Sequence, residues 1–387
     1  MKNKNFIIVL CFLIFALISS GGCGGSSSSK SRIERLVQDM TLEAKIGQMF
    51  IIRPEHLNSA MSADAIHETK TSCDIELNDV MIETLNKYPA GGFALFSRNL
   101  QSPEQLKNFT DDLMDASVTI PFIAVDEEGG RVARIGNHGS FDVPKIPPMQ
   151  EIGTSGDTSL AYAAGSIIGG YLSDYGFNLD FAPVADVNIN PDNIVIGDRS
   201  FGSDPHLVSE MDSAFLSGLH SRGILGTLKH FPGHGDTTSD THTGYVAIYK
   251  TWDELLQAEL IPFIENFNNT DMVMIEHITL INITSDDLPA SMSYQLITER
   301  LRNELNYDGV VITDSMEMGA INNAYPSGEA TLKSIEAGVD IVLLPYDYRE
   351  SFNAVLNAVK SGRISEQRIN KSVERIIELK IKIFNNY

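Results

Sequence analysis

The stretch GILGTLKHFPGHGDTTSDTH occupies positions 223–242 and predicts a buried strand that opens into a polar loop. Residues 223–228 form an apolar run of the kind found in strands that are buried on both faces. Pro232, Gly233 and Gly235 then interrupt regular structure. One lysine, three histidines and two aspartates follow the apolar run. A His-rich polar turn is the plain alternative. Loops carried by a rigid scaffold are where chemistry concentrates, so we treat this loop as a candidate site.

Seven further apolar runs surround this one, and each is bounded by Gly, Pro or Asp. Together they make eight predicted strands, at 48–52, 92–96, 121–125, 178–184, 223–228, 271–275, 309–313 and 339–344. Strands that are apolar on both faces and alternate with helices are typical of a parallel sheet. Eight such units in about 300 residues predict an α/β fold, a (β/α)₈ TIM-type barrel with its active-site groups at the carboxyl ends of the strands. A doubly wound open sheet is the alternative, because periodicity does not reveal closure.

Helical spacing fills the segments between these runs. The predicted helices lie at 31–40, 103–116, 159–175, 207–220, 252–267 and 294–305, and a long amphipathic helix at 363–384 ends the chain. No linker rich in Pro or Ser follows the eighth predicted strand. We therefore expect residues 32–387 to form one barrel domain without a second domain.

The beginning of the chain predicts export. Two lysines precede an apolar run at 6–18, which is too short for a comfortable membrane span, and small residues lead to Cys23. The pattern resembles a bacterial lipoprotein signal, in which residues 1–22 are the signal peptide, Cys23 is lipidated and residues 23–31 are a flexible Gly/Ser tether. Ser20 departs from that pattern, which usually has an aliphatic residue there, so plain secretion stays open. We expect an extracytoplasmic monomer that meets the membrane only through a lipid anchor, or a secreted or periplasmic protein.

Charge and composition narrow the class of partner. The 387 residues carry a net charge of −22, and 43% of them are hydrophobic. The apolar fraction is ample for a core. Nucleic-acid binding needs basic patches, so a chain this acidic is expected to have no nucleic-acid partner. The chain has three cysteines, and Cys11 leaves with the leader, so a disulfide framework is excluded.

Polar residues directly follow five of the eight predicted strands. They are Asp126, Glu127, Glu128, Arg131, Asp186, Lys229, His230, Glu276, His277, Asp314 and Ser315. Any one of them is explained by a surface salt bridge. The whole set is not, because the carboxyl ends of barrel strands converge on one mouth.

At these residues the sequence resembles glycoside hydrolase family 3, specifically its single-domain β-N-acetylglucosaminidases. The likeness runs from the segment at 40–49 to the final helix, nearly the whole mature chain. Its most specific parts are the motifs at 126–132, 196–202, 229–242 and 313–315. These four motifs stand in the family's order, which makes the resemblance strong.

The resemblance implies a retaining glycosidase mechanism. Asp314 matches the nucleophile that forms a glycosyl-enzyme, a role that suits an ionised carboxylate, although an Asp at a strand-to-helix turn also caps helices. His242 matches the acid/base, and an imidazole with a pKa of about 6.5 gives and takes a proton near neutral pH. Most glycosidases use a second carboxylate there. Asp240 matches the partner that orients the ring, as in the Asp–His pair of serine proteases.

The remaining matches are substrate-binding residues. Asp126 resembles the carboxylate that grips sugar hydroxyls, and Arg134, Arg199, Lys229 and His230 resemble the surrounding donors. The resemblance implies no cofactor and no metal.

Two further residues of these segments receive weaker assignments. His234 is as compatible with a structural hydrogen bond in the loop as with sugar contact. Glu276 is not expected to be catalytic.

Several alternatives stay open. His230, His234, Asp236 and His242 are conceivable metal ligands, although Pro232 and its neighbours argue against the helix that would align the first two. A non-catalytic sugar-binding lipoprotein is a second alternative, which would need neither nucleophile nor proton-transfer pair. Within the family, a β-glucosidase or a β-N-acetylglucosaminide phosphorylase remains possible.

The substrate that the resemblance implies is a terminal β-linked N-acetylglucosaminide. Because export is predicted, peptidoglycan fragments are the first expectation for its source and chitooligosaccharides the second.

Overall fold

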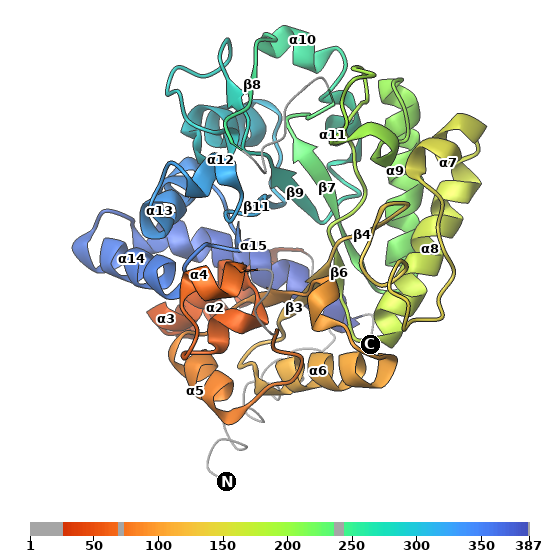
Figure 1. Cartoon of the computed structure of the whole chain (residues 1–387). Helices are drawn as coiled ribbons and strands as arrows, with labels where there is room; N and C mark the ends of the chain where they lie inside the picture. Colours follow the sequence, from red (N-terminus) through yellow and green to blue (C-terminus); the bar gives the residue numbers. More distant parts are fainter. Residues whose placement is uncertain (1–25, 69–72, 236–243, 386–387) are drawn as a thin grey trace.

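The computed structural model of the chain describes residues 26–68, 73–235 and 244–385, and its centre is an eight-stranded parallel sheet (Figure 1). The strands are β1 (Phe50–Ile52), β2 (Gly92–Ala94), β3 (Phe122–Val125), β6 (Leu179–Asp180), β7 (Leu225–Phe231), β9 (Met272–Ile275), β11 (Val310–Thr313) and β12 (Val342–Leu343). Each lies within or overlaps one of the eight apolar runs. The prediction of eight strands from those runs is confirmed.

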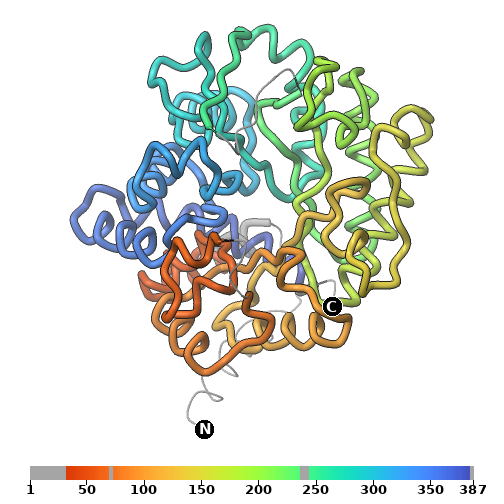
Figure 2. Tube along the Cα trace, in the orientation of Figure 1, coloured from red at the N-terminus to blue at the C-terminus, as the bar shows by residue number. Residues whose placement is uncertain are grey.

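The sheet closes into a barrel. Each strand pairs in parallel with the next one along the chain, and β1 pairs in parallel with β12, where Phe50 lies opposite Val342. A parallel bridge between Ile312 and Ile341 joins β11 to β12. Figure 2 shows the resulting ring, with the red N-terminal part of the chain beside the blue C-terminal part. The (β/α)₈ barrel is therefore confirmed, and the doubly wound alternative is wrong.

Helices surround the barrel and bury its outer face (Figure 1). They are α2 (Ser26–Asp39), α3 (Leu42–Gln48), α4 (Ala63–His67), α5 (Asp79–Lys87), α6 (Pro103–Ala116), α7 (Met149–Ser155), α8 (Thr158–Asp174), α9 (Pro205–His220), α10 (Trp252–Leu256), α11 (Ile261–Asn266), α12 (Gly319–Asn322), α13 (Ser327–Ala337), α14 (Tyr348–Ser361) and α15 (Glu366–Asn385). All residues of β3, β9 and β11 are buried, because side chains fill the barrel on one face and helices cover the other. This double burial explains why the strands are continuous apolar runs in the sequence.

Local chemistry sets several helix boundaries. Helix α6 begins at Pro103, where Ser102 caps it by accepting the N–H of Gln105 at 3.2 Å. The predicted helix at 252–267 is instead two helices, α10 and α11. Pro262 lies in the first turn of α11, where its missing N–H is tolerated, whereas a helix interior would reject it.

Three other elements differ from the predictions. Helix α2 begins at Ser26, five residues before the predicted start and inside the segment predicted to be a flexible tether. The predicted helix at 294–305 is a π-helical segment, η5 (Gln295–Glu304). Strand β6 is shorter than its apolar run, which continues into Pro183, a residue without an N–H for the ladder.

Two small ladders stand at the carboxyl end of the barrel. Strand β4 (Glu127–Gly129) pairs antiparallel with β5 (Val132–Ala133) just after β3. Strand β8 (Ala247–Ile248) pairs with β10 (Thr279–Leu280), which follow β7 and β9. None of the helices in the described ranges is both long enough and apolar enough to span a membrane.

Helix α15 seals the opposite end of the barrel with a buried lysine. Lys380 Nζ donates to Gln48 Oε1 and to the carbonyl of Gly91, both at 2.7 Å, and lies 4.7 Å from the centre of the Phe122 ring. Burial lowers the pKa of Lys380 to about 7. Lys380 itself is therefore held to the strand amino ends by hydrogen bonds, whereas Arg375 of the same helix forms ion pairs with Asp308 at 2.6 Å and Asp340 at 3.3 Å.

Candidate active site

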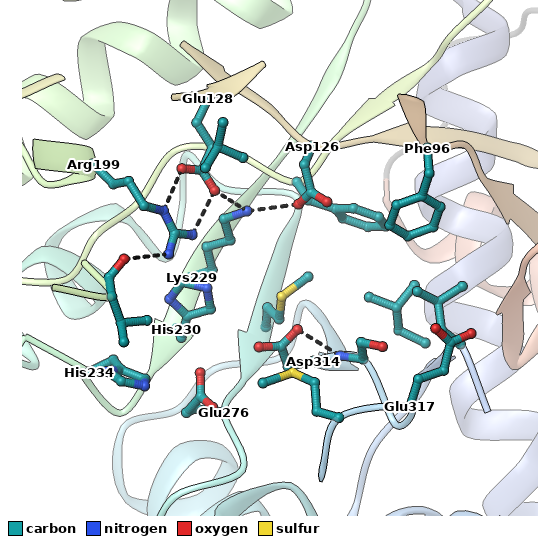
Figure 3. Close-up of a pocket in the computed structure, with 18 of the residues that line it drawn as sticks. Phe96, Asp126, Glu128, Arg199, Lys229, His230, His234, Glu276, Asp314 and Glu317 are labelled. Carbon is teal, nitrogen blue, oxygen red and sulfur yellow. Dashed lines mark hydrogen bonds and ion pairs between the residues drawn. The ribbon is translucent and has the colours of Figure 1, made fainter. Parts of the chain in front are cut away.

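A cavity of about 430 Å³ opens at the carboxyl ends of the barrel strands (Figure 3). Every strand contributes to its wall, with Arg53 after β1, Phe96 after β2, Asp126 after β3, Phe181 after β6, Lys229 on β7, Glu276 after β9, Asp314 after β11 and Leu344 after β12. The volume lies in the range of small-molecule sites. Its position agrees with the expectation that barrel enzymes act at this end.

Alternation along an extended segment sorts the three acidic residues after β3. Asp126 and Glu128 line the cavity, whereas Glu127 lies on the other side of the segment. The Glu127 carboxylate accepts the N–H of Ile135 at 2.8 Å and the hydroxyl of Tyr171 at 2.9 Å. Glu127 is thus tied to the backbone and to α8, which positions its two neighbours.

Glu128 joins two cations that are far apart in the sequence. Arg199 donates to both of its oxygens at 2.8 Å, and Lys229 Nζ lies 2.6 Å from Oε1 (Figure 3). Burial by itself favours the neutral acid, but Arg199 and Lys229 outweigh it and hold the pKa of Glu128 well below its ordinary value. The carboxylate is therefore ionised and serves as the anchor for both cations.

Asp126 is the part of this network that faces the cavity. Lys229 Nζ lies 3.0 Å from its Oδ1, and Arg134 Nη2 lies 3.4 Å from its Oδ2. Loss of solvent raises the pKa of Asp126, whereas Lys229 and Arg134 lower it, and the net shift is downward. An ionised, half-buried carboxylate between two donors is well placed to accept sugar hydroxyls.

Lys229 and His230 both lie on β7, not in the loop beyond it as the sequence predicted. Adjacent strand residues normally face opposite sides of a sheet. Here the register with β9 shifts between Leu228 and Phe231, and both side chains reach the cavity.

Asp186 orients His230 from behind. The carboxylate accepts His230 Nδ1–H at 2.7 Å and the backbone N–H of His234 at 2.6 Å. Burial lowers the pKa of His230, but Asp186 outweighs burial and raises it. With Nδ1 used in this way, the Nε2 atom of His230 is the one left to contact a ligand.

Asp314 follows β11 and lies across the cavity from the Asp126–Lys229 pair (Figure 3). Its N–H donates to the carbonyl of Ile275 at 2.8 Å, and its Oδ1 accepts the N–H of Ser315 at 2.6 Å. Loss of solvent raises the pKa of Asp314, but His230 and other cationic neighbours outweigh it, and the net shift is downward. The second oxygen, Oδ2, is left for chemistry as part of an ionised carboxylate.

A second ion pair, between Arg53 and Glu317, belongs to the cavity wall, and Figure 3 shows Glu317 on the side opposite Arg199. Arg53 donates to both oxygens of Glu317, at 2.8 and 2.6 Å, and its guanidinium stacks over Phe96 at 3.8 Å. Arg134 lies 5.9 Å from the same ring. This part of the wall thus combines an ion pair with an aromatic ring.

The structure brings together six of the residues predicted from the sequence. These six predicted residues, which all line the cavity, are Asp126, Arg134, Arg199, Lys229, His230 and Asp314. Asp240 and His242, the predicted proton-transfer pair, lie outside the described residues, as do Asp236 of the metal-ligand alternative and Cys23.

Four residues that the sequence left without a predicted role contribute to the site. They are Glu128, Asp186, Arg53 and Glu317. The position of Glu128 could have been predicted, because residues two apart in an extended segment face the same side, and Asp126 faces the cavity. The sequence placed Asp186 at the barrel mouth but did not indicate its contact with His230. It did not indicate that Arg53 and Glu317 form a pair.

The fold and the site together are those of a (β/α)₈ barrel with a polar site of paired carboxylates and cations at the carboxyl ends of its strands. The chain belongs to glycosyl hydrolase family 3, since the family described as "Glycosyl hydrolase family 3 N terminal domain" matches residues 41–379. The family resemblance inferred from the four motifs is confirmed.

Named relatives agree with this placement. The chain is 36% identical over 333 residues to "Beta-hexosaminidase A" of Pseudoalteromonas piscicida, covering 78% of this chain and 55% of that protein. It is 34% identical over 292 residues to "Beta-hexosaminidase" of Tolumonas auensis, and the match covers 74% of this chain and 84% of that protein. The structure of a glycoside hydrolase family 3 beta-N-acetylglucosaminidase from Paenibacillus sp. str. FPU-7 superposes with a TM-score of 0.81 at 35% identity. The match covers 90% of this chain and 64% of that one. The chain thus spans little more than half of the first relative and most of the second.

Proposed function

We propose that the protein is a retaining exo-β-N-acetylglucosaminidase that forms a glycosyl-enzyme at Asp314. The observation that carries the proposal is the ionised Asp314 carboxylate, which ends β11 and faces a cavity lined by paired carboxylates and cations. The names of two relatives support a hexosaminide as the substrate, and the name of the Paenibacillus structure supports an N-acetylglucosaminide.

The proposed reaction has two displacements at the anomeric carbon. In the first, Asp314 Oδ2 forms a bond to C1 while the C1–O bond to the leaving group breaks, and His242 gives its proton to the departing oxygen. In the second, water attacks C1, the bond to Asp314 breaks and His242 takes the proton from water. Asp240 holds the imidazole and stabilises its cation. Two inversions retain the β configuration.

The other residues of the cavity hold the terminal sugar. Asp126 accepts hydrogen bonds from sugar hydroxyls, and Arg134, Lys229 and His230 present N–H groups to the ring substituents. Arg199 acts partly through Glu128, which keeps Lys229 in place. Because these partners are fixed before substrate arrives, little reorganisation accompanies binding.

The charges of the wall favour water over phosphate as the acceptor. Among the described lining residues there are five carboxylates, Asp126, Glu128, Glu276, Asp314 and Glu317, and four permanently charged cations, Arg53, Arg134, Arg199 and Lys229. Each of these cations is already paired with a carboxylate of the wall. A phosphate dianion would therefore enter a site without excess positive charge.

The experiment is a comparison of wild type with Asp314→Asn on 4-nitrophenyl glycosides. We expect wild type to prefer the N-acetyl-β-D-glucosaminide to the β-D-glucoside, and Asp314→Asn to lose turnover of every substrate, because no other group replaces the bond to carbon. NMR should show the β anomer of the sugar as the first product. First release of the α anomer, or full activity in Asp314→Asn, would overturn the mechanism. Stimulation by phosphate with formation of the sugar 1-phosphate would overturn the choice of acceptor.

We further propose that the enzyme acts outside the cytoplasm on peptidoglycan fragments or chitooligosaccharides, anchored through a lipid on Cys23. The short apolar run and the small residues before Cys23 support the anchor. Fractionation of cells that express wild type or Cys23→Ala tests it. Wild type should stay with membranes and Cys23→Ala should become soluble. Equal solubility of the two would leave simple secretion.

A further inference from the structure

A second cluster of metal-ligand side chains lies beside the cavity, outside the group assigned to the sugar. His56 comes from the 3₁₀ helix η1 (Pro54–Leu57) after β1, His67 ends α4, and Glu317 follows β11. One ligand atom from each lies within 4.8 Å of the other two. Residues far apart in the chain thus converge on one point.

His56 presents a buried nitrogen that has no partner among the described residues. The side chain is 3% exposed, and its Nε2 accepts or donates no hydrogen bond. Leaving a buried polar group unpaired is unfavourable, so a ligand for this nitrogen would relieve a penalty. Because the ring is held in place by edge contacts with His67 and Tyr348, the nitrogen cannot turn freely toward solvent.

His67 is oriented so that its lone pair faces a carboxylate. Its Nε2 lies 2.9 Å from the carbonyl oxygen of Tyr346, which can only accept, so Nε2 carries the proton. In the neutral ring Nδ1 is then an acceptor, yet it lies 3.6 Å from Glu317 Oε1, another acceptor. Stacking on Tyr346 at 4.1 Å fixes the ring plane. A cation between these two acceptors reconciles them, and it is either a proton on Nδ1 or a bound metal ion.

The outer contacts have the form of a metal site's supporting shell. A metal-bound histidine commonly donates its other N–H to a carbonyl, as His67 does, and a ligating carboxylate is itself hydrogen-bonded, as Glu317 is by Arg53. Arg53 also offsets the charge of Glu317. The net electrostatic attraction for a hard cation such as Mg²⁺ is therefore small. A preference for one metal ion over another must come from the two imidazoles.

We propose that His56, His67 and Glu317 bind a divalent transition-metal ion of the zinc class. Two imidazole nitrogens and one carboxylate oxygen are typical ligands for Zn²⁺, with water in the fourth position, whereas Mg²⁺ and Ca²⁺ prefer oxygen alone. The ion links the segment after β1 to the segment after β11. Since Glu317 also holds Arg53 in the cavity wall, the ion stabilises that wall.

One other group of possible ligands in the described chain, formed by His230, Glu276 and Asp314, also has its ligand atoms within 4.8 Å of one another. It belongs to the sugar site already described and carries no separate proposal. An ion there would contact the nucleophile and compete with substrate. The experiment must therefore distinguish the two clusters.

The test uses the whole chain, freed of metal with a chelator and then titrated with Co²⁺, whose visible absorption reports tetrahedral N/O coordination. We expect wild type to bind one equivalent of Co²⁺ at this cluster, and His67→Ala and His56→Gln not to bind it. Zn²⁺ should raise the Tm of wild type but not that of these two variants. His67 is only half-buried, so His67→Ala stays informative if His56→Gln does not fold.

Two control variants distinguish binding at this cluster from binding elsewhere on the chain. His206→Ala removes an imidazole that is 67% exposed and lies 3.1 Å from Glu265, a pair that belongs to no three-ligand cluster of the described chain, and it should keep the equivalent. Asp314→Asn should keep it too. Equal binding by wild type and His67→Ala, or loss of the equivalent in Asp314→Asn, would overturn the proposal.

Discussion

Replacement of Glu128 by glutamine should destabilise the protein far more than replacement of an exposed glutamate. Glu128 is 2% exposed and is the partner of Arg199 at 2.8 Å and of Lys229 at 2.6 Å. Glutamine keeps the shape but removes the charge, so two cations lose their shared counter-ion. Arg199 retains the carbonyl of Val195 at 3.2 Å, and Lys229 retains Asp126 at 3.0 Å.

The expected loss follows from this partial compensation. Removing one member of a buried ion pair costs about 3–5 kcal/mol, and the remaining partners place Glu128→Gln near the lower end, at about 3 kcal/mol. That corresponds to a decrease on the order of a hundredfold in the folding equilibrium constant. Glu329→Gln is the matched control, because Glu329 and Arg363 form a pair that is 40% and 41% exposed, and such pairs contribute about 0–1 kcal/mol.

The dependence on pH adds a second test. The pKa of Glu128 is lower in the folded state than its ordinary value of 4.5. Its stabilisation is therefore complete above that value and is lost as the pH falls through the lower folded-state pKa. The difference between wild type and Glu128→Gln should be constant at neutral pH and shrink in acid.

Urea unfolding followed by circular dichroism and by the fluorescence of the single tryptophan, Trp252, measures both effects. The variant should also show a raised KM, since Lys229 loses its fixed position. The reasoning is refuted if Glu128→Gln and Glu329→Gln lose equal stability, or if the Glu128→Gln difference does not change between neutral pH and pH values well below 4.5.

Three further predictions concern the site and the far end of the barrel. Arg199→Ala and Lys229→Ala should each raise KM more than they lower kcat, with an unchanged pH optimum; a shifted limb of the pH profile would give Lys229 a proton-transfer role. His242→Ala should lose about 10²–10⁴-fold on a disaccharide but much less on aryl glycosides with acidic phenols, and azide should restore deglycosylation; equal dependence on leaving-group pKa in both enzymes would remove His242 from the acid role. Lys380 has a pKa lowered to about 7, so protonation favours the unfolded state, and wild-type stability relative to Lys380→Met should rise from about pH 7 to about pH 10; a flat difference would contradict this.

Much of the barrel could be predicted from the sequence because its signals are local. A strand buried on both faces is an apolar run wherever it occurs, and a residue such as Pro103 or Ser102 marks a helix start within one turn. The position of Asp314 at the end of such a run placed it at the barrel mouth. The motifs then indicated the family, and the family indicated the expected partners of Asp314.

The sequence could not show which groups meet at that mouth. Glu128 contacts Arg199, 71 residues away, and the ring closes only where Ile312 meets Ile341. The sequence predicted a loop for Lys229 and His230, whereas both lie on β7 and both reach the cavity because the register of that strand shifts. Periodicity encodes which face of an element is buried, since that depends on the residue's own neighbours. The partner of a charge depends on how whole strands are arranged around the barrel, and only the tertiary structure decides it.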